Sequence, residues 1–188
     1  YSTLSHLGLI TLLLGLGSEL AVVAAVFHIL NHATFKASLF MAAGIIDHEC
    51  GTRDLRRING LIRYMPWTSV LAMTAAAAMA GVPLLNGFLS KEMFFAEALT
   101  VDHPLLAWLV PTGAVLAGLL GVAYSTRFIH DTFFHGEPVG LDRTPHEPPL
   151  WMRIPVDLLV LVCVAVGLLP MQTFGPLLAV AVPAVTGA

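Results

Sequence analysis

Three residues that can carry protons repeat along one apolar stretch of this chain. His28, His32 and Lys36 lie four residues apart. At about 100° per residue they drift by only about 80° in total, so a helix would present them as one polar stripe. A charged lysine near the centre of a bilayer is costly and must face a partner or water. Because imidazole exchanges protons near neutral pH, the stripe predicts a proton path through a membrane.

Two other interpretations of this stripe remain open. The histidines could be ordinary hydrogen-bonding core residues, with Lys36 reaching an interface. Lys36 lies about ten residues before the next polar loop, or about 15 Å of helix. At that depth its ammonium does not easily reach the interface. His28 and His32 also have the spacing of two zinc ligands, but a third ligand and a general-base glutamate are missing from the stripe, so no metal is predicted.

The second lysine follows a break in the hydrophobic pattern. Gly81 to Gly87 contains glycine and proline, which interrupt a helical hydrogen-bond ladder, and Lys91 and Glu92 come a few residues later. Irregular backbone at membrane depth is tolerated only where protein or water surrounds it. We expect Lys91 to face the interior, with Glu92 and Glu97 directed to a helix end or a neighbour. The alternative is a surface helix with a solvated lysine.

Two further groups of polar residues have simpler interpretations. His6 lies beside small hydroxyl residues, which favours hydrogen bonding between helices, with a part in proton transfer as the alternative. Asp47 to Cys50 resembles a set of metal ligands, but we place it in a solvated loop without matching partners and predict no metal or cofactor. Cys50 and Cys163 lie in different settings and are predicted to be free thiols.

The composition indicates that lipid is the solvent. The 188 residues are 57% hydrophobic and 11% charged, whereas soluble domains have about 25% charged residues. A soluble domain and a disordered chain are therefore both excluded. The net charge of −3 makes nucleic acid an unsuitable partner. The nine basic residues include only two lysines, Lys36 and Lys91.

The hydrophobic pattern predicts an all-α, polytopic transmembrane helix bundle with about five to six spans and a discontinuous helix near residues 81–87. A proline-interrupted tail follows the last predicted span and is short for another one. The expected helices cover residues 4–18, 20–46, 64–80, 88–99, 104–130 and 150–169.

Arginine placement predicts the topology. The loops at 47–63 and 131–149 carry or adjoin all seven arginines, and positive charge favours the cytoplasmic side. Both loops can lie on one side of the membrane in two ways. The expected helices 64–80 and 88–99 cross the membrane once together, or helix 64–80 spans it and helix 88–99 folds back. Arg53, Arg56 and Arg57 are interpreted as topology and lipid-headgroup residues.

Several motifs resemble a known family of membrane proteins. His28 to Phe40 resembles the H-x-x-x-H-A-x-F-K-A-x-L-F signature of antiporter-like subunits, which include the large subunits of Mrp-type Na⁺/H⁺ antiporters and the proton-pumping subunits of respiratory complex I. Tyr1 to Ser5 resembles the Y-S-T-x-S helix start. Asn59 to Pro66 resembles the G-G-L…M-P loop, with Asn59 replacing glycine. Ala80 to Glu92 resembles the broken-helix motif, with Leu84 replacing a proline. Ile46 to Asp54 is similar to the D-H-E-x-G-T-R-D loop of the A-type branch of Mrp antiporters.

The resemblance implies part of an ion-translocating domain in a multi-pass protein of the cell (inner) membrane. It implies Lys36, His28 and His32 as a central relay and Lys91 as the lysine of the discontinuous helix. It also implies other antiporter subunits as partners and Na⁺ and protons as transported ions. We expect residues 1–135 to belong to the second inverted repeat of that domain, 136–149 to form a polar loop, and 150–188 to form the following helix and an apolar tail. The chain is interpreted as a piece of a longer polypeptide, with the missing part upstream. The alternatives are a purely structural membrane module and a redox-driven proton-pump subunit.

Overall fold

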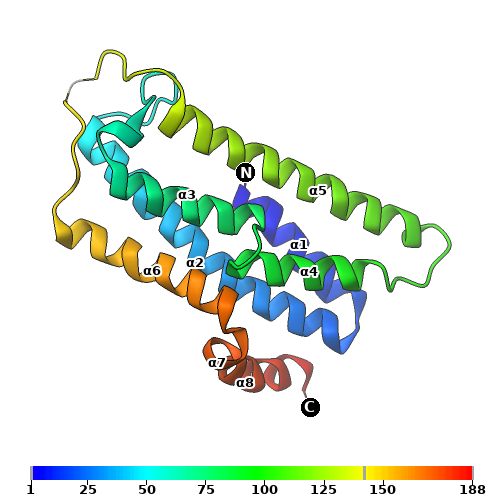
Figure 1. Ribbon diagram of the computed structural model, residues 1–188. Coiled ribbons are helices and arrows are strands. Elements are labelled where there is room, and N and C mark those ends of the chain that lie inside the picture. Colours follow the sequence, from blue (N-terminus) through cyan, green and yellow to red (C-terminus); the bar gives the residue numbers. More distant parts are fainter. Residues whose placement is uncertain (1, 142, 188) are drawn as a thin grey trace.

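The computed structural model describes residues 2–141 and 143–187, and every regular element within them is helical. The longer helices form one elongated bundle (Figure 1). Tyr1 of the helix-start motif lies outside the described residues. The elements are α1 (Ser2–Leu16), α2 (Glu19–Cys50), the short η1 (Leu61–Arg63), α3 (Pro66–Ala80), α4 (Asn86–Ala98), α5 (Leu106–Ile129), the π turn η2 (His130–Phe134), α6 (Leu150–Leu168), α7 (Pro170–Thr173) and α8 (Gly175–Thr186).

Helix α2 runs through the bundle, and α1, α3, α4, α6 and α8 all pack against it. Ser18 caps its first turn by accepting a hydrogen bond from the Ala21 amide at 2.9 Å. Its end differs from the prediction, because the helix continues to Cys50 and stops at Gly51, which adopts φ 72°. The placement of Asp47 to Cys50 in a solvated loop was therefore wrong. Tertiary packing extends the helix by covering Glu49 and Cys50.

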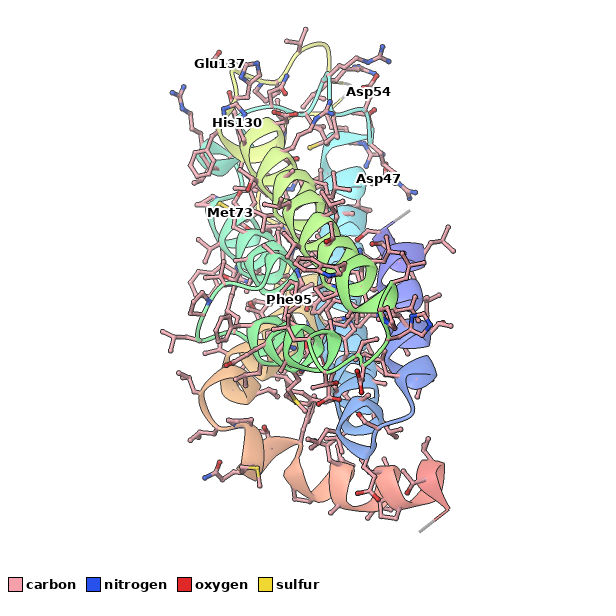
Figure 2. All side chains as sticks on the ribbon, turned by 90° about the vertical axis from the view of Figure 1, so that its right-hand side faces the viewer. Asp47, Asp54, Met73, Phe95, His130 and Glu137 are labelled. Carbon is pink, nitrogen blue, oxygen red and sulfur yellow. The ribbon has the colours of Figure 1, made fainter. Side chains whose placement is uncertain are left out.

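The predicted discontinuous helix is confirmed. Helix α3 ends at Ala80, Gly81 takes φ 91°, and α4 begins at Asn86, so the two helices lie end to end (Figure 1). Asp54, His130 and Glu137 gather at the same end of the molecule in Figure 2. The two polar loops therefore share one side, and α3 and α4 make a single crossing together.

Two close backbone approaches hold this break in place. A Cβ atom on Gly87 would overlap the carbonyl oxygen of Ala78, so the start of α4 lies directly against the end of α3. A Cβ atom on Gly167 of α6 would overlap the carbonyl of Leu84. Leu84 itself adopts φ 71°, a left-handed conformation that is uncommon for a residue with a side chain. The glycines thus allow three backbone segments to meet at one point.

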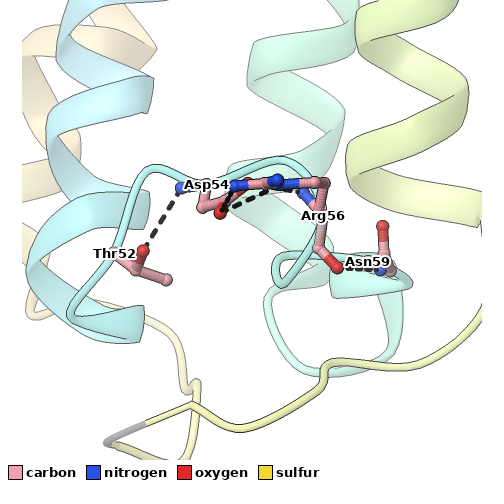
Figure 3. Close-up of polar contacts among 4 residues, drawn as sticks. All are labelled: Thr52, Asp54, Arg56 and Asn59. Carbon is pink, nitrogen blue, oxygen red and sulfur yellow. Dashed lines mark hydrogen bonds and ion pairs between the residues drawn. The ribbon is translucent and has the colours of Figure 1, made fainter.

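The polar loops are ordered by their own hydrogen bonds. The Asp54 carboxylate accepts bonds from the amide and guanidinium of Arg56, and the Thr52 hydroxyl accepts from the Asp54 amide (Figure 3). The Asn59 side chain donates to the Arg56 carbonyl (Figure 3). The hydrogen bond from the Arg56 side chain is the main reason that the pKa of Asp54 falls to about 2. The loop therefore keeps its carboxylate charged throughout the neutral range.

A carboxylate from the second loop completes the start of α3. Pro66 is the first residue of this helix, and the preceding Met65 has no side chain that can cap it. Glu147 accepts hydrogen bonds from the amides of Trp67 and Thr68 at 2.6 and 3.1 Å, and from the Thr68 hydroxyl at 2.8 Å. An anion at a helix N-terminus is stabilised by both the free amides and the helix dipole. Glu147 therefore anchors the first half of the broken helix.

Among the described residues, three helical stretches are long and apolar enough to cross a membrane individually: Glu19–Cys50, Leu106–Phe134 and Leu150–Leu168. Helices α3 and α4 lie end to end beside them (Figure 1), and Ser2–Leu16 and Gly175–Thr186 are shorter apolar helices. The predicted all-α membrane bundle is thus confirmed. The proline-rich tail, expected to be broken, forms α7 and α8 at the end of the bundle away from the polar loops (Figure 1).

Gly87→Ala should destabilise the protein, because its new methyl group would collide with the Ala78 carbonyl. Overpacking of this kind costs about 1–3 kcal/mol. The control is Gly44→Ala in α2, where a methyl group would meet no atom within 4 Å and helix propensity would improve. Thermal unfolding of the purified protein in detergent should show a lower Tm for Gly87→Ala only. An unchanged Tm would contradict the close approach.

Candidate functional site

Three imidazole rings meet near the centre of the bundle. His6 of α1 lies against His28 and His32 of α2, with ring centroids 5.2 and 5.0 Å apart, and the His28 and His32 centroids are separated by 6.3 Å. His6 Nδ1 and His28 Nε2 share a hydrogen bond of 3.0 Å. His6 is 4% exposed and His28 is completely buried, so these rings are shielded within the protein. The structure thus places His6 of α1 against the two histidines of the predicted stripe.

The cluster is connected to α4 through a serine that the sequence reasoning missed. Ser90 Oγ lies 3.0 Å from His28 Nδ1 and 3.3 Å from the Gly87 carbonyl, to which it donates. Ser90 is completely buried. Its position directly before Lys91 was the available signal, because a buried hydroxyl on the broken helix needs a partner.

Helix α5 contributes a tyrosine that was also missed. The Tyr124 hydroxyl lies 3.3 Å from His6 Nε2 and accepts a hydrogen bond from the Ser2 hydroxyl at 3.1 Å. A phenol inside an otherwise apolar segment usually finds a hydrogen-bond partner, and that was the signal in the sequence. Four helices, α1, α2, α4 and α5, therefore supply hydrogen-bonding groups to one network.

Lys91 crosses the break in the helix. Its ammonium donates hydrogen bonds to the carbonyls of Met79 at 2.7 Å and Ala80 at 2.9 Å, which belong to the last turn of α3. These carbonyls lack helical partners and lie at the negative end of the α3 dipole. Lys91 is buried, whereas Glu92 is exposed. This agrees with the prediction that the two neighbours point in different directions.

A small cavity separates Lys91 from His6. Its volume is about 30 Å³, and Gly121 and Tyr124 of α5 also line it. That volume is enough for about two water molecules. A Cβ atom on Gly121 would lie 3.5 Å from Lys91 Nζ and 3.9 Å from the Tyr124 hydroxyl. The absence of a side chain at Gly121 thus leaves room between the ammonium, the phenol and the imidazole.

Lys36 lies beside a second, larger cavity. This cavity has a volume of about 240 Å³, and Ser2 and Tyr124 form part of its wall. The half-buried Lys36 ammonium lies 5.9 Å from the centre of the Phe40 ring, a distance that permits a cation–π interaction. Lys36 was predicted to face a partner or water, and the structure places it beside this cavity and the Phe40 ring.

His32 joins the cluster by ring contact. Its Nε2 atom is buried and has no hydrogen-bond partner among residues 2–141 and 143–187. The predicted stripe of His28, His32 and Lys36 shares one face of α2. The hydrogen bonds of His28, however, go to neighbouring helices, to His6 of α1 and Ser90 of α4.

The acidic side chains of α4 do not neutralise the two lysines. Within the described part of the chain, neither Lys36 nor Lys91 forms an ion pair with a carboxylate. Glu97 accepts a hydrogen bond from the Ser18 hydroxyl, which joins the start of α2 to α4. Glu92 lines an outer cavity of about 420 Å³ that Lys91 also borders. Lys91 therefore lies between an outer cavity and the inner one shared with His6.

Known proteins with similar sequences are membrane transport proteins. Residues 1–117 match the family described as "NADH:quinone oxidoreductase/Mrp antiporter, TM". A probable K(+)/H(+) antiporter subunit of the A/B type from Rhizobium meliloti is 66% identical over 97% of this chain, and an A-type Na(+)/H(+) antiporter subunit from Bacillus subtilis is 40% identical over 90% of it. The chain spans 18% and 24% of the length of these two relatives.

Two solved structures contain chains with a similar fold. A chain of the Mrp complex from Dietzia sp. matches with a TM-score of 0.82 and 36% identity, covering 98% of this chain and 20% of the other. A chain of respiratory complex I from Thermus thermophilus matches with a TM-score of 0.81 and 26% identity, covering 97% of this chain and 38% of the other.

Ser90→Ala should lower stability, because it leaves His28 Nδ1 buried without its partner. An unsatisfied buried polar group costs about 1–3 kcal/mol. The matched control is Ser69→Ala, since the buried Ser69 hydroxyl donates to the carbonyl of Met65, the residue directly before α3, at 2.6 Å. Thermal unfolding should give a larger fall in Tm for Ser90→Ala than for Ser69→Ala. Equal falls would mean that the His28–Ser90 contact contributes nothing specific.

Proposed function

Because the chain belongs to the NADH:quinone oxidoreductase/Mrp antiporter transmembrane family, we propose that it is a proton-translocating part of a multisubunit monovalent cation/proton antiporter in the bacterial cell membrane. Protons would move through the described network in exchange for Na⁺ or K⁺, the two cations that appear in the names of its relatives. The other subunits of the antiporter complex would be its partners, and the process would be transport rather than enzyme catalysis.

One observation carries this proposal: a row of proton-exchanging groups joins two cavities, each bordered by a lysine. The row begins at Lys91 and the 30 Å³ cavity and passes through His6 to Tyr124, which also lines the 240 Å³ cavity of Lys36. His28 extends the row from the other nitrogen of His6. In a purely structural module, replacing such buried polar groups with well-packed apolar ones of the same shape is often neutral or stabilising. Proton transfer gives a reason to keep them.

Lys91 is suited to hold and release a proton. Two of the three donors of its ammonium are bound to the Met79 and Ala80 carbonyls, and the third is free to face a cavity. The carbonyls favour the charged form, while burial disfavours it. A nearby positive charge, such as a protonated His6 across the small cavity, would add repulsion and favour release. The proton would then leave through water in the inner or outer cavity.

His28 and His32 are proposed as relay partners, and Glu92 as a peripheral group. His28 is bonded to His6 and Ser90, so it can accept a proton at one nitrogen and give one up at the other. His32 lies within ring contact of His6, and its buried Nε2 has no hydrogen-bond partner in the described part of the chain, so it is left available to exchange a proton. Glu92 borders the outer cavity beside Lys91 and would attract cations to its mouth.

The second candidate is a proton-pumping membrane subunit of an NADH–quinone oxidoreductase. The fold shared with a complex I chain favours it, but the identity to that chain is lower than to the antiporter subunits. Vesicles containing the assembled complex separate the two. A pH change driven by a Na⁺ or K⁺ gradient without NADH supports the antiporter. Proton movement that requires NADH and quinone supports the pump.

Lys91→Ala and Lys36→Ala should each reduce cation-driven proton flux to background, because each removes an ammonium from the path. We expect a loss of at least about 10²-fold, the scale of removing one proton-transfer group. The control is Arg63→Gln, which also removes one positive charge, here from an exposed pair with Glu137. Flux is measured with a pH-sensitive dye in proteoliposomes of the full complex. Flux that survives both lysine changes would refute the relay and favour a structural role.

A further inference from the structure

The hydrogen bonds around the imidazole cluster can all point in one direction. The Ser2 hydroxyl donates to the Tyr124 oxygen, which leaves the phenol proton free for His6 Nε2. His6 then carries its proton on Nδ1 and donates to His28 Nε2 at 3.0 Å. His28 in turn donates from Nδ1 to Ser90, whose own proton goes to the Gly87 carbonyl. Tyr124, His6, His28 and Ser90 therefore each accept one hydrogen bond and donate one.

The first two members of this series lie where the larger cavity meets the cluster. Ser2 and Tyr124 line the 240 Å³ cavity together with Lys36. Tyr124 also lines the 30 Å³ cavity together with His6 and Lys91. Tyr124 thus borders both cavities, and its hydroxyl is hydrogen-bonded to Ser2, which lines the larger one, and to His6, which lines the smaller one. His32 is the alternative connection along α2, but its buried Nε2 has no hydrogen-bond partner in the described part of the chain.

We propose that the Ser2 and Tyr124 hydroxyls conduct protons between the Lys36 cavity and His6, and that this pair, rather than His32, is the entrance to the imidazole cluster. This inference rests on the proposed function, and it names the route within that site.

Proton transfer through this pair leaves both hydroxyls neutral. A protonated water in the Lys36 cavity gives its proton to Ser2 Oγ as the Ser2 proton moves to the Tyr124 oxygen. The Tyr124 proton moves to His6 Nε2 in the same event, so His6 becomes an imidazolium with protons on both nitrogens. One O–H bond breaks and one forms at each oxygen, and no phenolate or alkoxide arises. His6 then releases its Nδ1 proton to His28, or its Nε2 proton through water toward Lys91.

The surroundings favour this orientation. The Ser2 hydroxyl also lies 3.5 Å from the Met79 sulfur, but a thioether is a weak acceptor, so the phenol oxygen is the better partner. The hydroxyls can rotate, which allows the series to reverse when a proton travels the other way. Gly121 leaves the space beside the Tyr124 hydroxyl unfilled, so rotation of the phenol proton toward the smaller cavity is not blocked.

Tyr124→Phe tests the route, because it removes only the hydroxyl. In proteoliposomes of the complete antiporter complex, we expect cation-driven proton flux to fall by roughly 10²-fold. Ser125→Ala on the same helix is the matched control, since the buried Ser125 hydroxyl donates only to the Gly121 carbonyl of its own helix. Ser2→Ala should also lower flux, and Ser2→Thr, which keeps a hydroxyl, should retain it.

A structural role for Tyr124 predicts the opposite ranking of two variants. If the ring only fills space, Tyr124→Phe is harmless and Tyr124→His is damaging. If the hydroxyl conducts protons, Tyr124→His retains a donor and an acceptor and keeps more flux than Tyr124→Phe. Assembly and Tm of each variant are measured so that flux is compared between equally folded complexes.

Lys91→Ala is assayed in parallel. Wild-type flux in Tyr124→Phe together with an inactive Lys91→Ala would overturn this inference and leave the proposed function intact. Flux in Lys91→Ala equal to wild type would overturn the proposed function itself.

Discussion

The ammonium of Lys91 is bonded to the last two carbonyls of α3, and the rest of the site depends on this contact. A lysine inside an apolar bundle needs polar partners, and a continuous helix offers none along its side because its carbonyls are already paired. Interrupting the helix after Ala80 exposes those carbonyls. The break in turn requires Gly87 and Gly167, where any side chain would collide with a neighbouring backbone. The buried charge of Lys91 therefore depends on the broken helix, and the broken helix depends on the two glycines.

Both ends of α3 are held by side chains from distant parts of the chain. Glu147 binds the free amides at its start, and Lys91 binds the free carbonyls at its end. An anion at the N-terminus and a cation at the C-terminus both complement the helix dipole. The polar loop that carries Glu147 is thereby coupled to the helix whose last turn holds the ammonium. The histidines and Tyr124 then occupy the space beside this fixed charge.

The hydrophobic pattern, the break and the positions of the two lysines could be read from the sequence, because lipid demands long apolar helices and makes each intramembrane charge conspicuous. The end of α2 was misjudged. Asp47 to Cys50 reads as polar loop, yet packing buries Glu49 and Cys50 and the helix continues. Local polarity could not reveal this, since the covering residues lie far away in sequence. His146 contacts Glu49, and Arg143 donates a hydrogen bond to the His48 carbonyl.

The sequence by itself determined the class of protein, the order of the helices and the face of α2 that carries His28, His32 and Lys36. Helical periodicity and the cost of burying charge are local properties, so they leave a direct record in the residues. Only the tertiary structure decided how these groups connect. The hydrogen bonds from His6 to His28 and Tyr124, and from Ser2 to Tyr124, cross between helices, and their partners are set by how the helices pack. A stripe on one helix therefore becomes a network through four.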